Sequence, residues 1–77
     1  MKKILDFYSK SCVPCTQLKK ELKSFENVEY IDVMEDFEKA LQYSVRKAPT
    51  VIILENGEEI NRFSGFRTKE EIASYLE

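Results

Sequence analysis

The chain has 77 residues, room for one small domain over residues 1–77, and its 43% hydrophobic and 34% charged residues are typical of a folded globular protein. Its 12 Lys and Arg side chains against 14 Asp and Glu give a formal net charge of −2. This balance argues against a nucleic-acid binder, since such proteins normally carry a basic excess.

The first segment of the chain, Lys2–Tyr8, is apolar and rich in aromatic residues, which predicts a buried strand. Asp6 stands where the apolar stretch of a signal peptide would have to continue. No apolar run in the chain approaches the roughly 18 residues that a membrane span needs. We therefore expect a cytoplasmic protein without a membrane partner.

A turn-like segment at residues 9–11 leads into a stretch with helical spacing. Leu18, Leu22 and Phe25 fall at i, i+4 and i+7, which predicts a helix from Pro14 to residues 26–27. Pro14 is compatible with the first helical turn because its missing N–H would have no intrahelical partner there.

The second half of the chain predicts three more strands. Residues 28–33 are rich in β-branched and aromatic side chains, and the continuous apolar run of residues 50–54 is typical of a central strand covered on both faces. A helix is expected between them at residues 36–44. Asn56-Gly57 is a strong hairpin signal, because both central residues of a type I′ turn need positive φ, so residues 58–64 should pair back as an edge strand.

The chain ends in a third predicted helix. Gly65 breaks the last strand, and the sequence of residues 68–71, Thr-Lys-Glu-Glu, fits a capping box. The resulting order is β-α-β-α-β-β-α. A parallel first strand pair with a right-handed crossover and an antiparallel hairpin give an α/β fold with a four-stranded mixed sheet. We expect the first and third helices on one face and the second on the other.

Cys12 and Cys15 stand at the junction of the first strand and the first helix. At this spacing the two sulfurs can meet at bonding distance. Cys12 lies just ahead of the helix, where free N–H groups and the positive end of the helix dipole favour a thiolate, so we expect a lowered pKa for its thiol. Cys12 would then attack a substrate disulfide, and Cys15 would resolve the mixed disulfide.

Several other kinds of site at these cysteines are excluded, and two alternatives remain. The chain has no His and only two Cys, which excludes Cys-His nucleophile pairs, His-ligated metals in a monomer and four-thiolate metal sites within one chain. A structural disulfide is an alternative, although a loop this short contributes only about 2 kcal/mol and cytosolic chains seldom keep one. A zinc site shared between two chains is a second alternative.

Three segments, in order along the chain, resemble the thioredoxin superfamily. Residues 6–15, Asp-Phe-Tyr-Ser-Lys-Ser-Cys-Val-Pro-Cys, resemble the family's Asp-Phe-Trp-x-x-Trp-Cys-Gly-Pro-Cys stretch, and residues 46–50, Arg-Lys-Ala-Pro-Thr, resemble its Arg-x-x-Pro-Thr. Residues 56–58, Asn-Gly-Glu, followed by Gly65, resemble its C-terminal hairpin. The resemblance implies a thioredoxin-like fold. Thioredoxins proper carry an additional N-terminal strand and helix, so this chain has the size of a glutaredoxin.

The resemblance also implies roles for individual residues. Cys12 would be the nucleophile and Cys15 the resolving thiol. Pro49 would follow a cis peptide bond that places the Ala48 backbone beside the cysteines, where it pairs with an extended substrate. Asp6 would be a buried carboxylate that takes the Cys15 proton, although a partly solvated Asp is the alternative.

Further residues complete the site that the resemblance implies. The substrate-binding set also includes Tyr8, Val13, Pro14 and Gly65. The lysine that the family pairs with the buried acid is absent, because its strand position holds Val28. The positive charges around the site either aid the thiolate and steer acidic partners or are solvated surface; they are Lys10, Arg46 and Lys47.

The predicted function is that of a thiol–disulfide oxidoreductase that reduces protein disulfides. Its only cofactor would be the redox-active Cys12–Cys15 disulfide. Its partners would be disulfide-containing client proteins and, by resemblance, an NADPH-dependent flavoprotein thioredoxin reductase, and we expect a monomer. One alternative is a glutathione-dependent glutaredoxin, which the sequence before Pro49 and the missing Gly-Gly-x-x-Asp at residues 65–68 disfavour. A non-catalytic binding module is the other, disfavoured because both cysteines are present.

Overall fold

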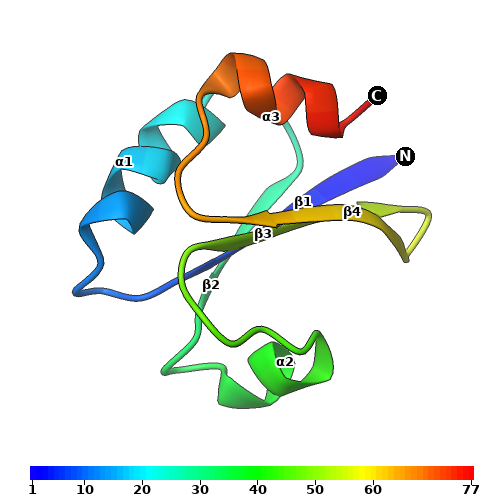
Figure 1. The fold of residues 1–77 in the computed structure, drawn as a ribbon. Helices are drawn as coiled ribbons and strands as arrows, with labels where there is room; N and C mark the ends of the chain where they lie inside the picture. The colour runs from blue at the N-terminus through cyan, green and yellow to red at the C-terminus, as the bar shows by residue number, and fades with distance from the viewer.

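A computed structural model describes all residues from 1 to 77, and the elements follow the predicted order β-α-β-α-β-β-α (Figure 1). The bounds are β1 Lys2–Tyr8, α1 Val13–Leu22, β2 Val28–Asp32, α2 Phe37–Gln42, β3 Thr50–Glu55, β4 Glu58–Ser64 and α3 Lys69–Tyr75. None of the three helices has the length and apolar character that crossing a membrane requires.

The four strands form one mixed sheet in the order β2-β1-β3-β4. β1 runs parallel to β2, with Asp6 opposite Tyr30, and antiparallel to β3, with Asp6 opposite Val51. The β3–β4 hairpin is antiparallel and turns at Asn56 and Gly57, whose φ angles of 53° and 87° have the sign expected for the predicted turn. The predicted mixed sheet is confirmed.

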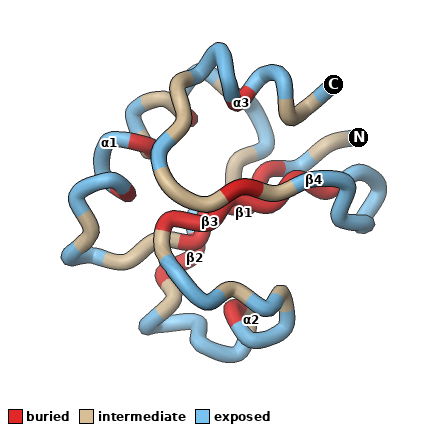
Figure 2. The backbone as a smooth tube through the Cα atoms, in the orientation of Figure 1, coloured by how far each residue is buried: buried red, intermediate tan, exposed pale blue.

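Two apolar clusters, one on each face of the sheet, form the core, and Figure 2 shows the buried residues concentrated along the strands. The cluster under α1 and α3 consists of Ile4, Leu18, Leu22, Val51, Ile53, Phe63 and Ile72. The cluster under α2 consists of Leu5, Phe7, Ile31, Ala40, Ile52 and Leu54. This confirms that the first and third helices share one face and that the second covers the other.

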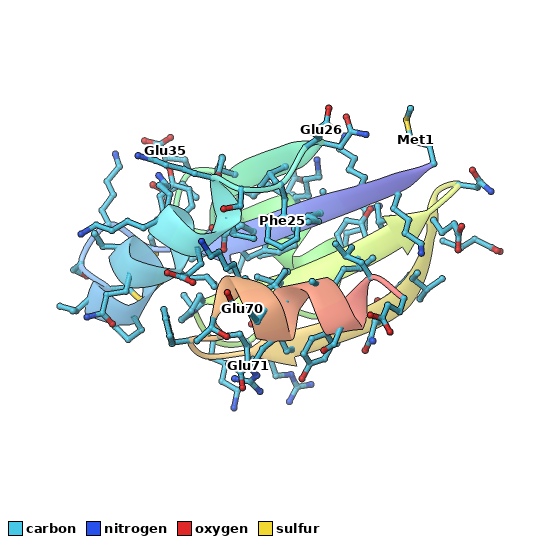
Figure 3. All side chains as sticks on the ribbon, turned by 90° about the horizontal axis from the view of Figure 1, so that it is seen from above. Met1, Phe25, Glu26, Glu35, Glu70 and Glu71 are labelled. Carbon is cyan, nitrogen blue, oxygen red and sulfur yellow. A yellow bond between two sulfur atoms is a disulfide. The ribbon has the colours of Figure 1, made fainter.

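The predicted ends of two helices were wrong. α1 ends at Leu22 rather than at residues 26–27, because the next N–H groups bond in tight turns, Phe25 to the carbonyl of Leu22 at 3.0 Å, and Asn27 takes a φ of 57°. Phe25, labelled in Figure 3, still packs against the core under α1, now from the turn that follows the helix. α2 is likewise shorter than residues 36–44, since Asp36 is its N-cap and Ser44 has a φ of 56°.

Candidate active site

The two cysteines lie at the N-terminus of α1, directly after the end of β1. Cys12 is the N-cap residue, with an extended backbone, and the N–H of Cys15 donates a hydrogen bond to Cys12 Sγ at 3.1 Å. The two sulfurs form a disulfide, with the Cα atoms 5.2 Å apart. Cys12 is half-buried and Cys15 is only 3% exposed. One sulfur is therefore accessible to a partner while the other is covered.

The backbone N–H that reaches Cys12 is one of the first four in α1, which have no partner inside the helix. It donates to the sulfur in the disulfide, and in the reduced protein the same N–H can stabilise a thiolate on that sulfur. The positive end of the helix dipole acts in the same direction. The position of Cys12 therefore favours a reactive nucleophile.

A second segment of the chain, the turn before β3, lies against the cysteines. The Ala48–Pro49 peptide bond is cis, the geometry that the resemblance implies, and Pro49 is buried. The carbonyl oxygen of Ala48 lies 3.8 Å from Cys12 Sγ. The Thr50 hydroxyl donates to the carbonyl of Lys47 at 2.6 Å and fixes the turn.

Gly65 holds this turn from the opposite side. Its N–H donates to the carbonyl of Pro49 at 2.9 Å, and its φ is +86°, in the region that L side chains rarely adopt. A Cβ at Gly65 would be 3.7 Å from the Arg67 side chain, so the backbone conformation rather than crowding requires glycine. Gly65 thus contacts the turn through its backbone, at the carbonyl of Pro49.

Asp6 is completely buried in β1, on the same sheet face as Ile4 and hence under α1. Neither of its carboxylate oxygens has a hydrogen-bond partner. Burial raises the pKa of Asp6 to about 7, and the positive charge of Lys19 opposes this by lowering it. An unpaired carboxyl that titrates near neutrality is suited to accept and return a proton.

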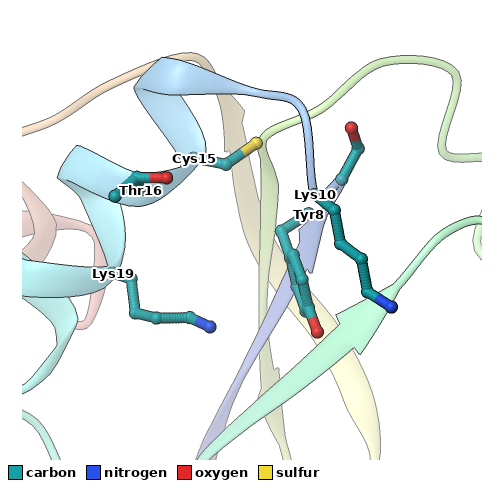
Figure 4. Close-up of a pocket in the computed structure, with 6 residues that line it drawn as sticks. Tyr8, Lys10, Cys15, Thr16 and Lys19 are labelled. Carbon is teal, nitrogen blue, oxygen red and sulfur yellow. The ribbon is translucent and has the colours of Figure 1, made fainter.

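A cavity of about 330 Å³ opens beside the covered cysteine (Figure 4). Its walls are Tyr8, Ser9, Lys10, Cys15, Thr16 and Lys19. In Figure 4 the end of Lys19 points toward the ring of Tyr8. Lys19 was not among the residues singled out from the sequence. Its position four residues after Cys15, which puts both side chains on one helix face, was the signal that could have found it.

The remaining predicted residues lie around the disulfide in different ways. Val13 and Pro14 are exposed in the first turn of α1. Lys10 is also exposed, but its ammonium bonds Glu35 at 3.0 Å and lies 3.9 Å from Asp32. The ammonium of Lys10 is therefore paired with these two carboxylates.

A second cavity, of about 270 Å³, adjoins the turn that holds Ala48. Arg46 and Lys47 line it together with apolar residues from the α2 region. Two of these, Met34 and Phe37, are 80% and 62% exposed. Neither was predicted from the sequence, although large apolar residues next to an acidic turn were the available signal. No group of three or more His, Cys, Asp and Glu side chains is arranged to hold a metal ion.

The chain is similar to proteins of known family. The family model described as Thioredoxin matches residues 1–77. A thioredoxin from Staphylococcus epidermidis is 29% identical over 82 residues, covering 97% of this chain and 79% of that protein. A probable thioredoxin from Caenorhabditis elegans is 32% identical over 81 residues, covering 96% and 56%.

Solved structures are similar over the same length. A thioredoxin variant from Halobacterium salinarum superposes with a TM-score of 0.89 at 28% identity, covering 99% of this chain and 75% of that chain. The thioredoxin of Fasciola hepatica gives a TM-score of 0.81 at 28% identity, covering 97% and 78%.

Proposed function

Since the chain belongs to the thioredoxin family and carries a disulfide-forming Cys12–Cys15 pair, it is a thiol–disulfide oxidoreductase, and we propose that Cys12 is the nucleophile that reduces client proteins. The observation that carries this assignment is the hydrogen bond from the Cys15 N–H to Cys12 Sγ at the helix N-cap. That contact gives the more accessible sulfur the environment that stabilises a thiolate.

The proposed reaction transfers two electrons from the cysteines to the client. The Cys12 thiolate attacks one sulfur of the client disulfide, which forms a mixed disulfide and releases the first client thiolate. Cys15 loses its proton and attacks Cys12 Sγ, so the Cys12–Cys15 disulfide forms and the second client thiolate leaves. The client becomes a dithiol after its thiolates take up two protons, and this chain becomes oxidised.

Asp6 is the proposed acceptor for the proton of Cys15. Its burial under α1 and its pKa of about 7 support this role, because near neutrality it is present both as carboxylate and as acid. The carboxyl has no competing hydrogen-bond partner. The proposed transfer runs through a water molecule between the two groups.

The proposed docking surface surrounds the accessible sulfur. The Ala48 carbonyl, 3.8 Å from Cys12 Sγ, is placed to pair with the backbone of an extended client segment. Pro49 and Gly65 hold that backbone in place, and the exposed side chains of Val13 and Pro14 border it. Tyr8 lies on the other side, in the cavity beside Cys15.

We further propose that an NADPH-dependent flavoprotein thioredoxin reductase returns two electrons to the Cys12–Cys15 disulfide. The thioredoxin relatives support this choice over glutathione, the donor that a glutaredoxin uses. A cytoplasmic location is proposed on the same grounds; the similar proteins include bacterial thioredoxins and also mitochondrial ones.

Two single substitutions test the order of attack. Cys12→Ser should abolish dithiothreitol-driven reduction of insulin, because the attacking thiolate is gone. Cys15→Ser should accumulate the mixed disulfide, which mass spectrometry detects as a covalent adduct on Cys12. The matched control is Ser11→Ala, an exposed neighbour that should retain wild-type turnover. Full activity in Cys12→Ser would show that the nucleophile has been assigned to the wrong sulfur.

A further inference from the structure

Asp6 has aromatic neighbours on the sheet face that α1 covers. Tyr8 follows it by two residues on β1, and Tyr30 lies directly opposite it on β2. Side chains alternate along a strand, and Ile4 and its partner Val28 both pack on this face, so Asp6, Tyr8 and Tyr30 share it.

The side chain of Lys19 extends from α1 to the rings of Tyr8 and Tyr30. Its Nζ lies 4.5 Å from the centroid of the Tyr8 ring and 5.0 Å from that of Tyr30. Lys19 is half-buried and is not part of any salt bridge, whereas the next lysine, Lys20, is exposed. Two aromatic rings therefore hold the Lys19 ammonium over β1, the strand that carries the buried carboxyl, and over the neighbouring β2.

We propose that Lys19 is a positioning residue whose ammonium, held by Tyr8 and Tyr30, sets the pH at which Asp6 takes the proton of Cys15. This inference rests on the proposed role of Asp6. It assigns to a helix residue the positive charge that the strand position of Val28 cannot supply.

The groups that face Asp6 come from each element packed around it. α1 contributes Lys19, whose charge acts on Asp6, and Cys15, which lines the same cavity as Lys19 and Tyr8. β2 contributes Tyr30 and, further along, Asp32, and the strand of Asp6 contributes Tyr8. β3 presents the apolar Val51 and α3 the apolar Ile72. The effect of Lys19 has a definite sign. A nearby positive charge favours the carboxylate, so removing it raises the pKa of Asp6 and leaves less carboxylate at neutral pH.

The first measurement is an NMR titration of the Asp6 side-chain carboxyl carbon in the oxidised protein, where Cys15 cannot titrate. Lys19→Met removes the charge and keeps most of the aliphatic chain, so the Asp6 midpoint should rise by about half a unit to one unit. Lys19→Arg should keep the midpoint near the wild-type value, and so should the control Lys20→Met. An unchanged midpoint in Lys19→Met would overturn the proposal.

The second measurement is the rate at which the mixed disulfide on Cys12 resolves in a single turnover, followed from pH 5 to pH 10. In Lys19→Met the pH profile should move to higher pH, and at pH 7 resolution should slow by about two- to fivefold as the carboxylate fraction falls. In the Asp6→Asn background, Lys19→Met should have no further effect.

The two measurements separate the failure of this inference from that of the proposed function. If Asp6→Asn resolves the mixed disulfide at the wild-type rate, Asp6 is not the proton acceptor, and the proposed function must be revised at that point. If Asp6→Asn slows resolution but Lys19→Met leaves both the profile and the Asp6 midpoint unchanged, Asp6 keeps its role and the role of Lys19 is refuted.

Discussion

The proposed role of Asp6 in proton transfer comes with a cost in stability. Its carboxyl is completely buried and has no hydrogen-bond partner. Such a group is costly to ionise, because water no longer solvates the charge. The charge of Lys19 reduces this cost only in part, since the pKa remains raised to about 7. An apolar residue at this position would stabilise the fold and remove the proposed proton acceptor.

The raised pKa of Asp6 predicts a specific pH dependence of stability. Folding favours the protonated carboxyl, so this contribution is fully present below the ordinary pKa of 3.8 and is lost as the pH rises to about 7. At about 1.4 kcal/mol for each pH unit between the two values, the loss amounts to at most about 4 kcal/mol. Urea unfolding of the oxidised protein at pH 5 and pH 8, compared with Asp6→Asn, measures it.

The Asp6→Asn variant should show little of this decline. As the pH rises, its free energy of unfolding should therefore increase relative to that of the wild type. The control is Glu26→Gln, which changes an exposed carboxyl and should keep the wild-type pH dependence. Parallel curves for wild type and Asp6→Asn would show that the Asp6 pKa is not raised.

At the scale of single elements, α3 is a short helix that depends on its first turn. It has seven residues and only one buried side chain, Ile72. Its start is a complete capping box, in which the N–H of Glu71 donates to the Thr68 hydroxyl at 3.2 Å and the N–H of Thr68 donates to the Glu71 carboxylate at 2.9 Å. Because so short a helix is marginal by itself, the cap and Ile72 together keep α3 on the sheet.

The cap of α3 can be tested by a single substitution. Thr68→Ala removes the oxygen that accepts the Glu71 N–H and should lower the free energy of unfolding by about 1 kcal/mol. Thr68→Ser, which keeps that oxygen, should remain within a few tenths of a kcal/mol of the wild type. Equal stability of the two variants in urea unfolding would contradict a role for the cap.

At the scale of the whole molecule, the sheet brings together parts of the site that are distant in sequence. Cys12 and Cys15 follow β1, the Ala48–Pro49 turn precedes β3, and Gly65 follows β4. β1 and β3 are the two central strands and β4 pairs with β3 at the edge, so these segments meet at one end of the sheet (Figure 1). The surface that a partner meets is therefore a property of the assembled fold.

The electron donor must recognise this assembled surface, so the choice of donor is tested with the intact protein. With insulin as client, NADPH with thioredoxin reductase should sustain turnover, and glutathione with its own reductase should not. This expectation follows from the proposed electron donor, which rests on membership of the thioredoxin family. Turnover with glutathione alone would instead assign the protein to the glutaredoxin alternative.

The sequence by itself determined what depends on a few neighbouring residues. Three features are local in this sense: the order of elements, the turn at Asn56 and Gly57, and the cap at Thr68. Each depends on side chains that are close to one another in the sequence. The place of Cys12 and Cys15 at a helix start was predictable for the same reason. The end of α1 was not, since Phe25 packs against the core equally well from a turn.

Tertiary structure alone decided which distant groups meet. It placed the Ala48 carbonyl 3.8 Å from Cys12 Sγ, across 36 residues of sequence. It also brought Lys19 between Tyr8 and Tyr30, beside a carboxyl whose expected strand partner is absent. These contacts depend on strand register and on how α1 lies on the sheet. Periodicity identifies the buried face of each element, but the packing of the whole core fixes which faces touch.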